Sequence, residues 1–161
     1  MSELLYFGYG ANRSYEMMDA IIGRRPSGYY AELQGYELCV QLWGEIPERA
    51  REMLGERGWD PTFRAYCIRQ ASERIVSGML WSLTSGEREL VSEWAMYGLW
   101  YETVTVPVTK RGQIIEAETE VINDPWIMQV VAGISYPEFL NKRKDMLRTS
   151  NMVRESYLAR K

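Results

Sequence analysis

The chain has 161 residues, 46% of them hydrophobic, and a formal net charge of −3 from 19 basic and 22 acidic side chains. This length and composition are those of one globular domain with an ordinary core. The charges are scattered, which argues against the concentrated positive surface that nucleic-acid backbones require. The chain has no histidine, the commonest general base and a favoured zinc ligand. Any catalysis must therefore use carboxylates, tyrosines, lysines or backbone amides.

The chain also lacks the sequence features of export and membrane insertion. Residues 1–5 show no basic region followed by an apolar stretch, and no run of about 18 apolar residues occurs. We therefore expect a cytoplasmic protein without a signal peptide or spanning helix, whose partner is a small molecule. Cys39 and Cys67 each lie in an apolar, strand-like run, which is typical of buried thiols rather than of a disulfide framework.

The first half of the chain predicts a strand, a glycine loop, a helix and then further strands. Gly23 is a typical helix end, residues 71–74 read as the turn of a hairpin, and Gly78 within a strand predicts a bulge or a close backbone approach. The expected elements are a strand at 4–7, a glycine loop at 8–10, a helix at 15–22 whose start is marked by residues 12–14, and a turn at 26–28. A strand at 36–43 follows a turn at 34–35, and then come a charged helix between 45 and 58 and strands at 63–70 and 75–83.

The second half predicts one more helix before two strands. Thr84–Glu87 has the polar cap and acidic first turn of a helix that we expect to end at Tyr97 and Gly98. Strands at 100–109 and 113–122 follow, joined by a turn at 110–112. Short helices are expected after residue 125, of which 136–147 is the clearest. We expect the basic tail after about residue 150 to be loosely held.

This order predicts a single α+β domain over residues 1–161, with a mixed, largely antiparallel, barrel-like sheet and flanking helices. A doubly wound parallel sheet does not fit, because strands and helices do not alternate along the chain.

The glycine loop is the first candidate functional element. Tyr9–Asn12 follows a strand and precedes a helix, an arrangement in which backbone N–H groups can hold an anionic or carbonyl oxygen. The loop lacks the lysine of a phosphate-binding loop and the third glycine of a dinucleotide-binding one. Taken alone, such a loop is in most proteins a tight strand-to-helix turn.

Several motifs together resemble the γ-glutamylcyclotransferase family. Tyr6–Asn12, which reads YFGYGAN, is similar to the family signature YFxYGSN, and Val76–Leu83 resembles its V-x-G-x-L-Y-x-L strand. Residues 23–38 are similar to the stretch before its second strand, and Leu90–Val108 to its L-D-x-W/Y-E-G helix and following strand. The order of motifs over the first two thirds of the chain is more specific than any one of them.

The resemblance implies a reaction without cofactor or metal. The α-amine of a γ-glutamyl group attacks its own γ-carbonyl, which closes 5-oxoproline and releases the attached amine or amino acid. The enzyme holds the chain curled and moves protons with one carboxylate. By the same resemblance, the backbone of Tyr9, Gly10, Ala11 and Asn12 grips the glutamyl carboxylate or carbonyl, and Tyr101 lines the pocket. Tyr101 is equally well interpreted as a half-buried strand aromatic.

The chain departs from the family at its catalytic glutamate, where it has Ala95, and at the preceding aspartate, where it has Ser92. Alanine cannot move a proton. Glu93 lies two helical positions away, a turn of about 200°, and Glu102 should point to the opposite strand face from Tyr101. Neither replaces the missing group.

Two explanations of Ala95 remain open: a substitution made to silence the base, or a natural relative that binds a ligand without turning it over. Arg13 is a candidate to pair with a substrate carboxylate, although an arginine in a first helical turn is usually solvated. Four tryptophans are candidates for the pocket wall or for the core: Trp43, Trp81, Trp94 and Trp100.

Overall fold

The computed structural model describes residues 3–122, 129–130 and 143–161. The strands are β1 Leu4–Gly8, β2 Ser27–Gln41, β3 Ala65–Leu83, β4 Tyr101–Lys110, β5 Gln113–Ile122 and β6 Gln129–Val130. The α-helices are α1 Tyr15–Ile22, α2 Glu48–Glu56, α3 Ser85–Trp94 and α5 Arg143–Ala159, and two short 3₁₀ helices are η1 Gly10–Arg13 and η2 Trp43–Glu45.

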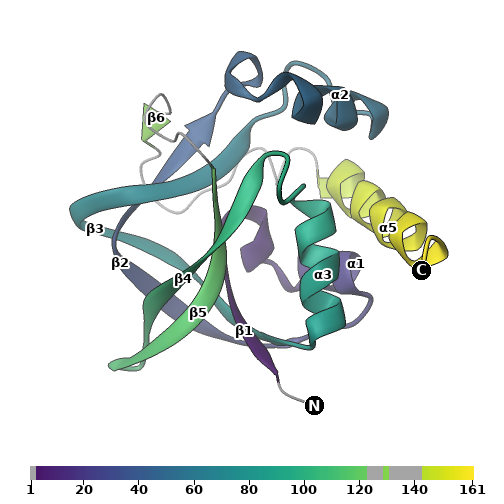
Figure 1. Ribbon diagram of the computed structural model, residues 1–161. Helices are drawn as coiled ribbons and strands as arrows, with labels where there is room; N and C mark the ends of the chain where they lie inside the picture. Colours follow the sequence, from purple (N-terminus) through teal and green to yellow (C-terminus); the bar gives the residue numbers. More distant parts are fainter. Residues whose placement is uncertain (1–2, 123–128, 131–142) are drawn as a thin grey trace.

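Five of the strands close into a barrel. Their order is β3-β1-β5-β4-β2, and β2 pairs again with β3 to complete the ring, while β6 adds to β2. The β1–β5 pair is parallel and the other four pairs of the ring are antiparallel. Figure 1 shows this barrel with helices beside it. The predicted α+β class with a mixed, barrel-like sheet is confirmed.

Alternating apolar residues fill the barrel. Phe7 of β1, Leu33 of β2, Ile68 of β3 and Val108 of β4 are all fully buried, as expected where every second side chain of a strand points inward. Gly78 of β3 permits β1 to approach, since a Cβ there would lie 2.5 Å from the carbonyl oxygen of Gly8 and 2.6 Å from a ring carbon of Phe7. The predicted close approach is confirmed.

Three of the predicted turns, at 26–28, 34–35 and 71–74, fall wholly or largely in strands. β2 already begins at Ser27, and β3 runs unbroken through residues 71–74, so the expected hairpin between 63–70 and 75–83 is wrong. The long strands pair with each other from Ser27–Ser82 to Gln41–Ala65. The register passes from Gln34–Ile75 to Tyr36–Gln70, so residues 71–74 have no partner in β2 and bulge out, with Glu73 at φ +64°. The polar composition therefore marks a bulge in one long strand, not the turn of a hairpin. The register shifts next to Gly35, which has φ +81°.

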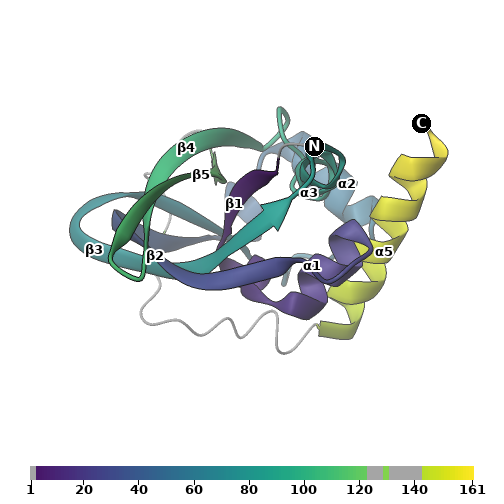
Figure 2. The same ribbon diagram turned by 90° about the horizontal axis from the view of Figure 1, so that it is seen from below.

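Helices α1, α3 and α5 pack against one another on one side of the barrel, and α2 lies over one end near the end of α3 (Figures 1 and 2). The chain beyond residue 150, where we expected a loose tail, is helical to Ala159. Arg154 of α5 donates to the carbonyl oxygens of Asp19 and Ala20 at the end of α1, at 3.1 and 2.7 Å. Most of the helix expected at 136–147 lies outside the described residues.

Helix α3 begins where the sequence predicts. The hydroxyl of Thr84 accepts from the N–H of Glu87 at 3.2 Å, and the Glu87 carboxylate accepts from the N–H of Thr84 at 2.9 Å. The helix ends at Trp94, earlier than expected, because Met96 adopts φ +56° and turns the chain toward β4.

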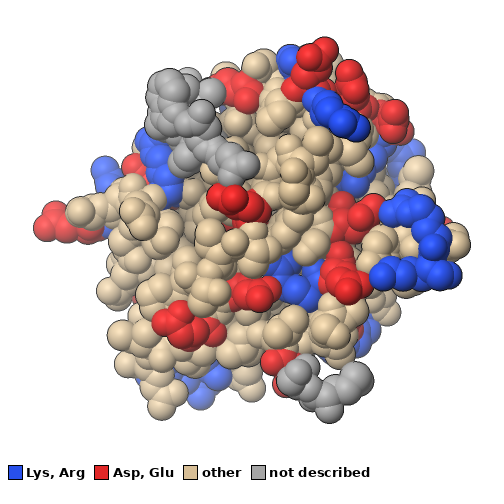
Figure 3. All heavy atoms as spheres, in the orientation of Figure 1, with Lys and Arg blue, Asp and Glu red and all other residues tan. Residues whose placement is uncertain are grey.

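Acidic and basic side chains are interspersed on the face of the molecule seen in Figure 3. No helix within the described parts of the chain is both long and apolar enough to cross a membrane.

Candidate active site

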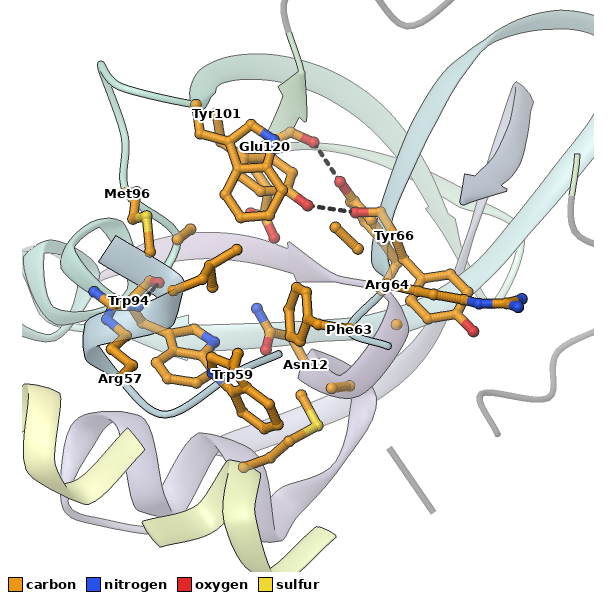
Figure 4. A pocket seen from close by; sticks show the side chains of 18 residues that line it. Asn12, Arg57, Trp59, Phe63, Arg64, Tyr66, Trp94, Met96, Tyr101 and Glu120 are labelled. Carbon is orange, nitrogen blue, oxygen red and sulfur yellow. Dashed lines mark hydrogen bonds between the residues drawn. The ribbon is translucent and has the colours of Figure 1, made fainter. Parts of the chain in front are cut away.

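A small cavity opens at the end of the barrel where η1, the end of α3 and the start of β4 meet (Figure 4). Its volume is about 110 Å³, well below the range of about 300–1,000 Å³ that is usual for drug-sized ligands. It suits a group of amino-acid size rather than a nucleotide. The six positions to which the family resemblance gives a role in the site all line it: Tyr9, Gly10, Ala11, Asn12, Ala95 and Tyr101.

The glycine loop forms one wall. Gly10 has φ +66°, a backbone conformation that favours glycine, and the chain then turns through η1 into α1. The N–H of Asn12 donates to the carbonyl oxygen of Tyr9 at 3.2 Å, so this amide is engaged within the loop. Gly10 and Ala11 open the 3₁₀ helix, where N–H groups have no partner within the helix. Their amides are the loop's better candidates for holding a ligand oxygen.

The two tyrosines predicted to bind substrate use their hydroxyl groups inside the protein. Tyr9 donates to the backbone carbonyl of Glu120 and Tyr101 donates to that of Tyr66, at 2.8 and 2.7 Å. Both side chains are nearly fully buried. They therefore offer the cavity fixed ring surfaces.

Ala95 lines the cavity from the C-terminal end of α3, where its N–H donates to the carbonyl oxygen of Val91 at 3.0 Å. Glu93 lies away from the cavity and pairs with Arg160 of the chain's C-terminal end at 2.6 Å. Glu102 of β4 is exposed. Neither glutamate lines the cavity, in agreement with the helix and strand geometry.

Sequence reasoning missed a carboxylate. Glu120 of β5 is only 5% exposed, and it is the one acidic residue of the described chain that lines the cavity. Its Oε1 accepts from the hydroxyl of Tyr6 and its Oε2 from the hydroxyl of Tyr97, both at 2.8 Å. Each phenol accepts in turn from a nitrogen at 2.9 Å: Asn12 Nδ2 for Tyr6 and Arg88 Nη2 for Tyr97. The carboxylate is thus fixed from both sides.

Burial raises the pKa of Glu120. The nearby Arg88 guanidinium and the two phenol hydrogen bonds act in the opposite direction, but do not outweigh the loss of hydration. Arg88 is itself buried, pairs with Glu118 at 2.9 Å, and lies over the rings of Tyr6 and Tyr97. A carboxyl group that titrates closer to neutrality is the kind that can both accept and return a proton.

The position of Glu120 on its strand explains why the sequence alone did not identify it as a site residue. Glu116, Glu118 and Glu120 alternate along β5 and share one face of the strand. Glu116 is exposed, Glu118 is half-buried and Glu120 is buried, because Arg88 of α3 and Tyr97 cover that end of the strand. Nothing local marks which of three alternating glutamates another element will cover.

Aromatic side chains form another part of the wall, and Figure 4 shows some of them around the cavity. Of the four candidate tryptophans, Trp94 and Trp100 line it, whereas Trp81 lies in the core and donates to the carbonyl oxygen of Asn12 at 2.8 Å. Trp43 and Arg13 are not among the lining residues. Two aromatics that the sequence did not single out, Trp59 and Phe63, line it as well.

Arg57 also lines the cavity, but its guanidinium is engaged elsewhere. It donates to the carbonyl oxygens of Trp94 and Glu93 at 3.0 and 3.2 Å, at the end of α3. Arg57 therefore holds this helix end in place beside Ala95.

The sequence matches no family model and no curated protein. Solved structures do match. One described as a gamma-glutamyl cyclotransferase has a TM-score of 0.62 and 16% identity, over 94% of this chain and 86% of its own. An uncharacterized human protein has a TM-score of 0.61 and 17% identity, over 95% and 87%. An Arabidopsis thaliana protein has a TM-score of 0.57 and 19% identity, over 98% and 94%. The chain therefore has the γ-glutamylcyclotransferase-like fold.

Proposed function

We propose that this chain, which has the γ-glutamylcyclotransferase-like fold, binds a γ-glutamyl compound in the cavity and belongs functionally with proteins that cyclise such a group to 5-oxoproline. The amine or amino acid attached to the glutamyl group would be the second product. The proposal requires no cofactor or metal.

One observation carries the proposal. The glycine loop, Ala95 and Tyr101 come from distant parts of the sequence, and all line one cavity in a fold shared with a gamma-glutamyl cyclotransferase. The size of the cavity, about 110 Å³, supports a compact, curled glutamyl group with the remainder of the substrate directed outward. Curling brings the α-amine to the γ-carbonyl, and such proximity supplies much of the rate enhancement in an intramolecular reaction.

A noncatalytic small-molecule binding protein on the same fold is the alternative. The observation that favours it is the methyl group of Ala95, which occupies the position where the resemblance places a proton-transferring glutamate. On this alternative, the chain binds the γ-glutamyl group and leaves it intact, whether the alanine is natural or was introduced to silence an enzyme.

Binding tests the proposal directly. Calorimetric titration with 5-oxoproline and with γ-glutamyl compounds should show saturable binding to the unsubstituted chain. Ala95→Leu, which adds three carbons to the cavity wall, should weaken it at least tenfold. Ala159→Leu, at an exposed position of α5, is the matched control and should not change it. Absence of binding to the unsubstituted chain would refute the proposal.

Turnover separates the two readings. Release of 5-oxoproline is measured in parallel for the unsubstituted chain and for Ala95→Glu. Release by the substituted chain alone would indicate a silenced enzyme. Binding without release by either chain would favour the binding protein.

A further inference from the structure

The cavity is lined by the carboxylate of Glu120, although the family resemblance places the proton-transferring glutamate at position 95. Ala95 lies at the end of α3, whereas Glu120 reaches the same cavity from β5. A cyclisation site needs one proton-transferring group that faces the substrate, and nothing in this chemistry requires the group to come from a helix. The strand side of the cavity is therefore a suitable source.

The surroundings of Glu120 differ from those of a carboxylate that merely fills a core. Both of its oxygens accept a phenol hydrogen bond, and a carboxylate has about four acceptor positions, so each oxygen retains capacity for one more donor. Its hydrogen bonds fix the plane of the carboxylate while the group lines the cavity. Such preorganisation is what a group needs if it is to meet a substrate ammonium in one orientation.

We propose that Glu120 is the catalytic acid and base of this site, in place of the residue at position 95. This inference rests on the proposed γ-glutamyl pocket and adds that the chain as it stands turns its substrate over. It makes the absence of a carboxylate at Ala95 compatible with activity.

The proton balance needs no further reactant. The Glu120 carboxylate takes one proton from the substrate's α-ammonium, and the freed nitrogen lone pair forms a bond to the γ-carbonyl carbon. The ring nitrogen of the resulting adduct gives up a second proton, while Glu120 returns the first to the leaving nitrogen as its bond to carbon breaks. The departing amine takes up the second proton, and Glu120 is ionised again.

The environment of the group suits this cycle. Burial raises the pKa of Glu120 above that of an exposed carboxyl, and it outweighs the opposing effects of the Arg88 guanidinium and of the hydrogen bonds from Tyr6 and Tyr97. A base of this kind takes a proton more readily than an ordinary carboxylate does, and as an acid it still returns that proton.

The decisive variant is Glu120→Gln, which keeps the shape of the side chain and removes its proton-accepting function. Release of 5-oxoproline is assayed with γ-glutamyl-alanine and γ-glutamyl-p-nitroanilide, and binding of 5-oxoproline is measured on the same samples. We expect kcat to fall by about 100-fold or more, while binding changes by less than tenfold. Glu116→Gln, on the same face of β5 but exposed and outside the cavity, should retain full activity.

A second variant addresses the same point even where Glu120→Gln fails to fold. Tyr97→Phe keeps Glu120 but removes a hydrogen bond that lowers the pKa of its carboxyl. In the unsubstituted chain kcat/KM should rise with pH as Glu120 ionises, and in Tyr97→Phe this rise should move to higher pH. The substrate's own ammonium titrates identically in both assays, so it cannot produce the shift.

The outcomes separate this inference from the proposed function. Binding of 5-oxoproline without turnover by the unsubstituted chain would overturn the role of Glu120 and leave the pocket assignment standing. Turnover that persists in Glu120→Gln, or a pH profile unmoved in Tyr97→Phe, would also overturn it. Failure of the unsubstituted chain to bind at all would remove the proposed function first.

Discussion

Glu120 occupies a position on β5 where simple alternation predicts exposure, yet it is buried beside Arg88 and two phenols. Its burial has a measurable thermodynamic effect. The pKa of the folded-state carboxyl is raised, so the folded state retains a proton that the unfolded chain releases at lower pH. Tighter binding of this proton stabilises the folded state. The stabilisation is fully present below the unfolded pKa of about 4.3 and is lost as pH rises through the folded pKa.

Glu120→Gln should remove this part of the pH dependence of stability. As pH rises from the unfolded pKa of about 4.3 through the raised folded pKa, the free energy of unfolding of the unsubstituted chain should fall relative to that of the variant. Urea denaturation at several pH values measures the difference. Glu116→Gln provides the comparison, because this glutamate is exposed and its curve should run parallel to that of the unsubstituted chain. A pH-independent difference for Glu120→Gln would contradict the expectation.

Cys39 and Cys67 are directly opposed on β2 and β3, and both are free and buried, as their apolar contexts predict. Burial raises the pKa of their thiols to about 11 and about 12. Because the thiolate is the reactive form, alkylation by iodoacetamide at pH 8 should be about 100-fold slower in the folded chain than in guanidinium chloride. Mass spectrometry of timed samples measures both rates. Similar rates in the two conditions would show that the thiols are accessible.

At the scale of elements, the sequence predicted helices by their caps and strands by alternation. It placed the starts of α1, α3 and β5 correctly, because Ser14, Thr84 and the turn at 110–112 are local signals. It failed at residues 71–74, where polar composition indicated a hairpin turn although the stretches on both sides, ending at Gln70 and starting at Ile75, pair with the same strand β2. Pairing of this kind depends on a distant partner, so no local pattern contains it.

The cap of α3 is also important for the site, since this helix presents Ala95 at its other end. Thr84→Ala removes the hydroxyl that accepts from the N–H of Glu87, and should lower the free energy of unfolding by about 1 kcal/mol. Thermal and urea denaturation measure the loss. Ser85→Ala, at the neighbouring exposed position, should change stability by less than about 0.5 kcal/mol. Equal losses for both variants would mean that the cap does not stabilise the helix.

At the scale of the whole molecule, the fold class followed from the order of elements, while the shape of the site did not. The six expected residues meet in one cavity because the barrel closes, and closure joins β1 to β5. The hydrogen bonds of Tyr6 and Tyr9 to Glu120 span 114 and 111 positions of the sequence. Contacts between residues so far apart in the chain produce no local periodic pattern, so they could not be predicted from the sequence.

Refolding should reflect these long-range contacts. Closing a chain over more than a hundred residues is slow compared with forming local helices, so binding of 5-oxoproline should recover only in the slowest phase of refolding. Stopped-flow circular dichroism follows the helices, and the same experiment with added 5-oxoproline follows the site by tryptophan fluorescence. Recovery of binding in step with the helical signal would contradict this order.

The parallel β1–β5 pair also affects how the site withstands local unfolding. Position 95 directly follows the last residue of α3 and precedes the left-handed Met96, and helix ends open far more readily than central strands. Tyr6 and Glu120 instead belong to strands with partners on both sides. When the end of α3 frays, the bond from Tyr97 is lost but the bond from Tyr6 keeps the carboxylate in place. Amide exchange should accordingly be much slower at β1 and β5 than at residues 93–97.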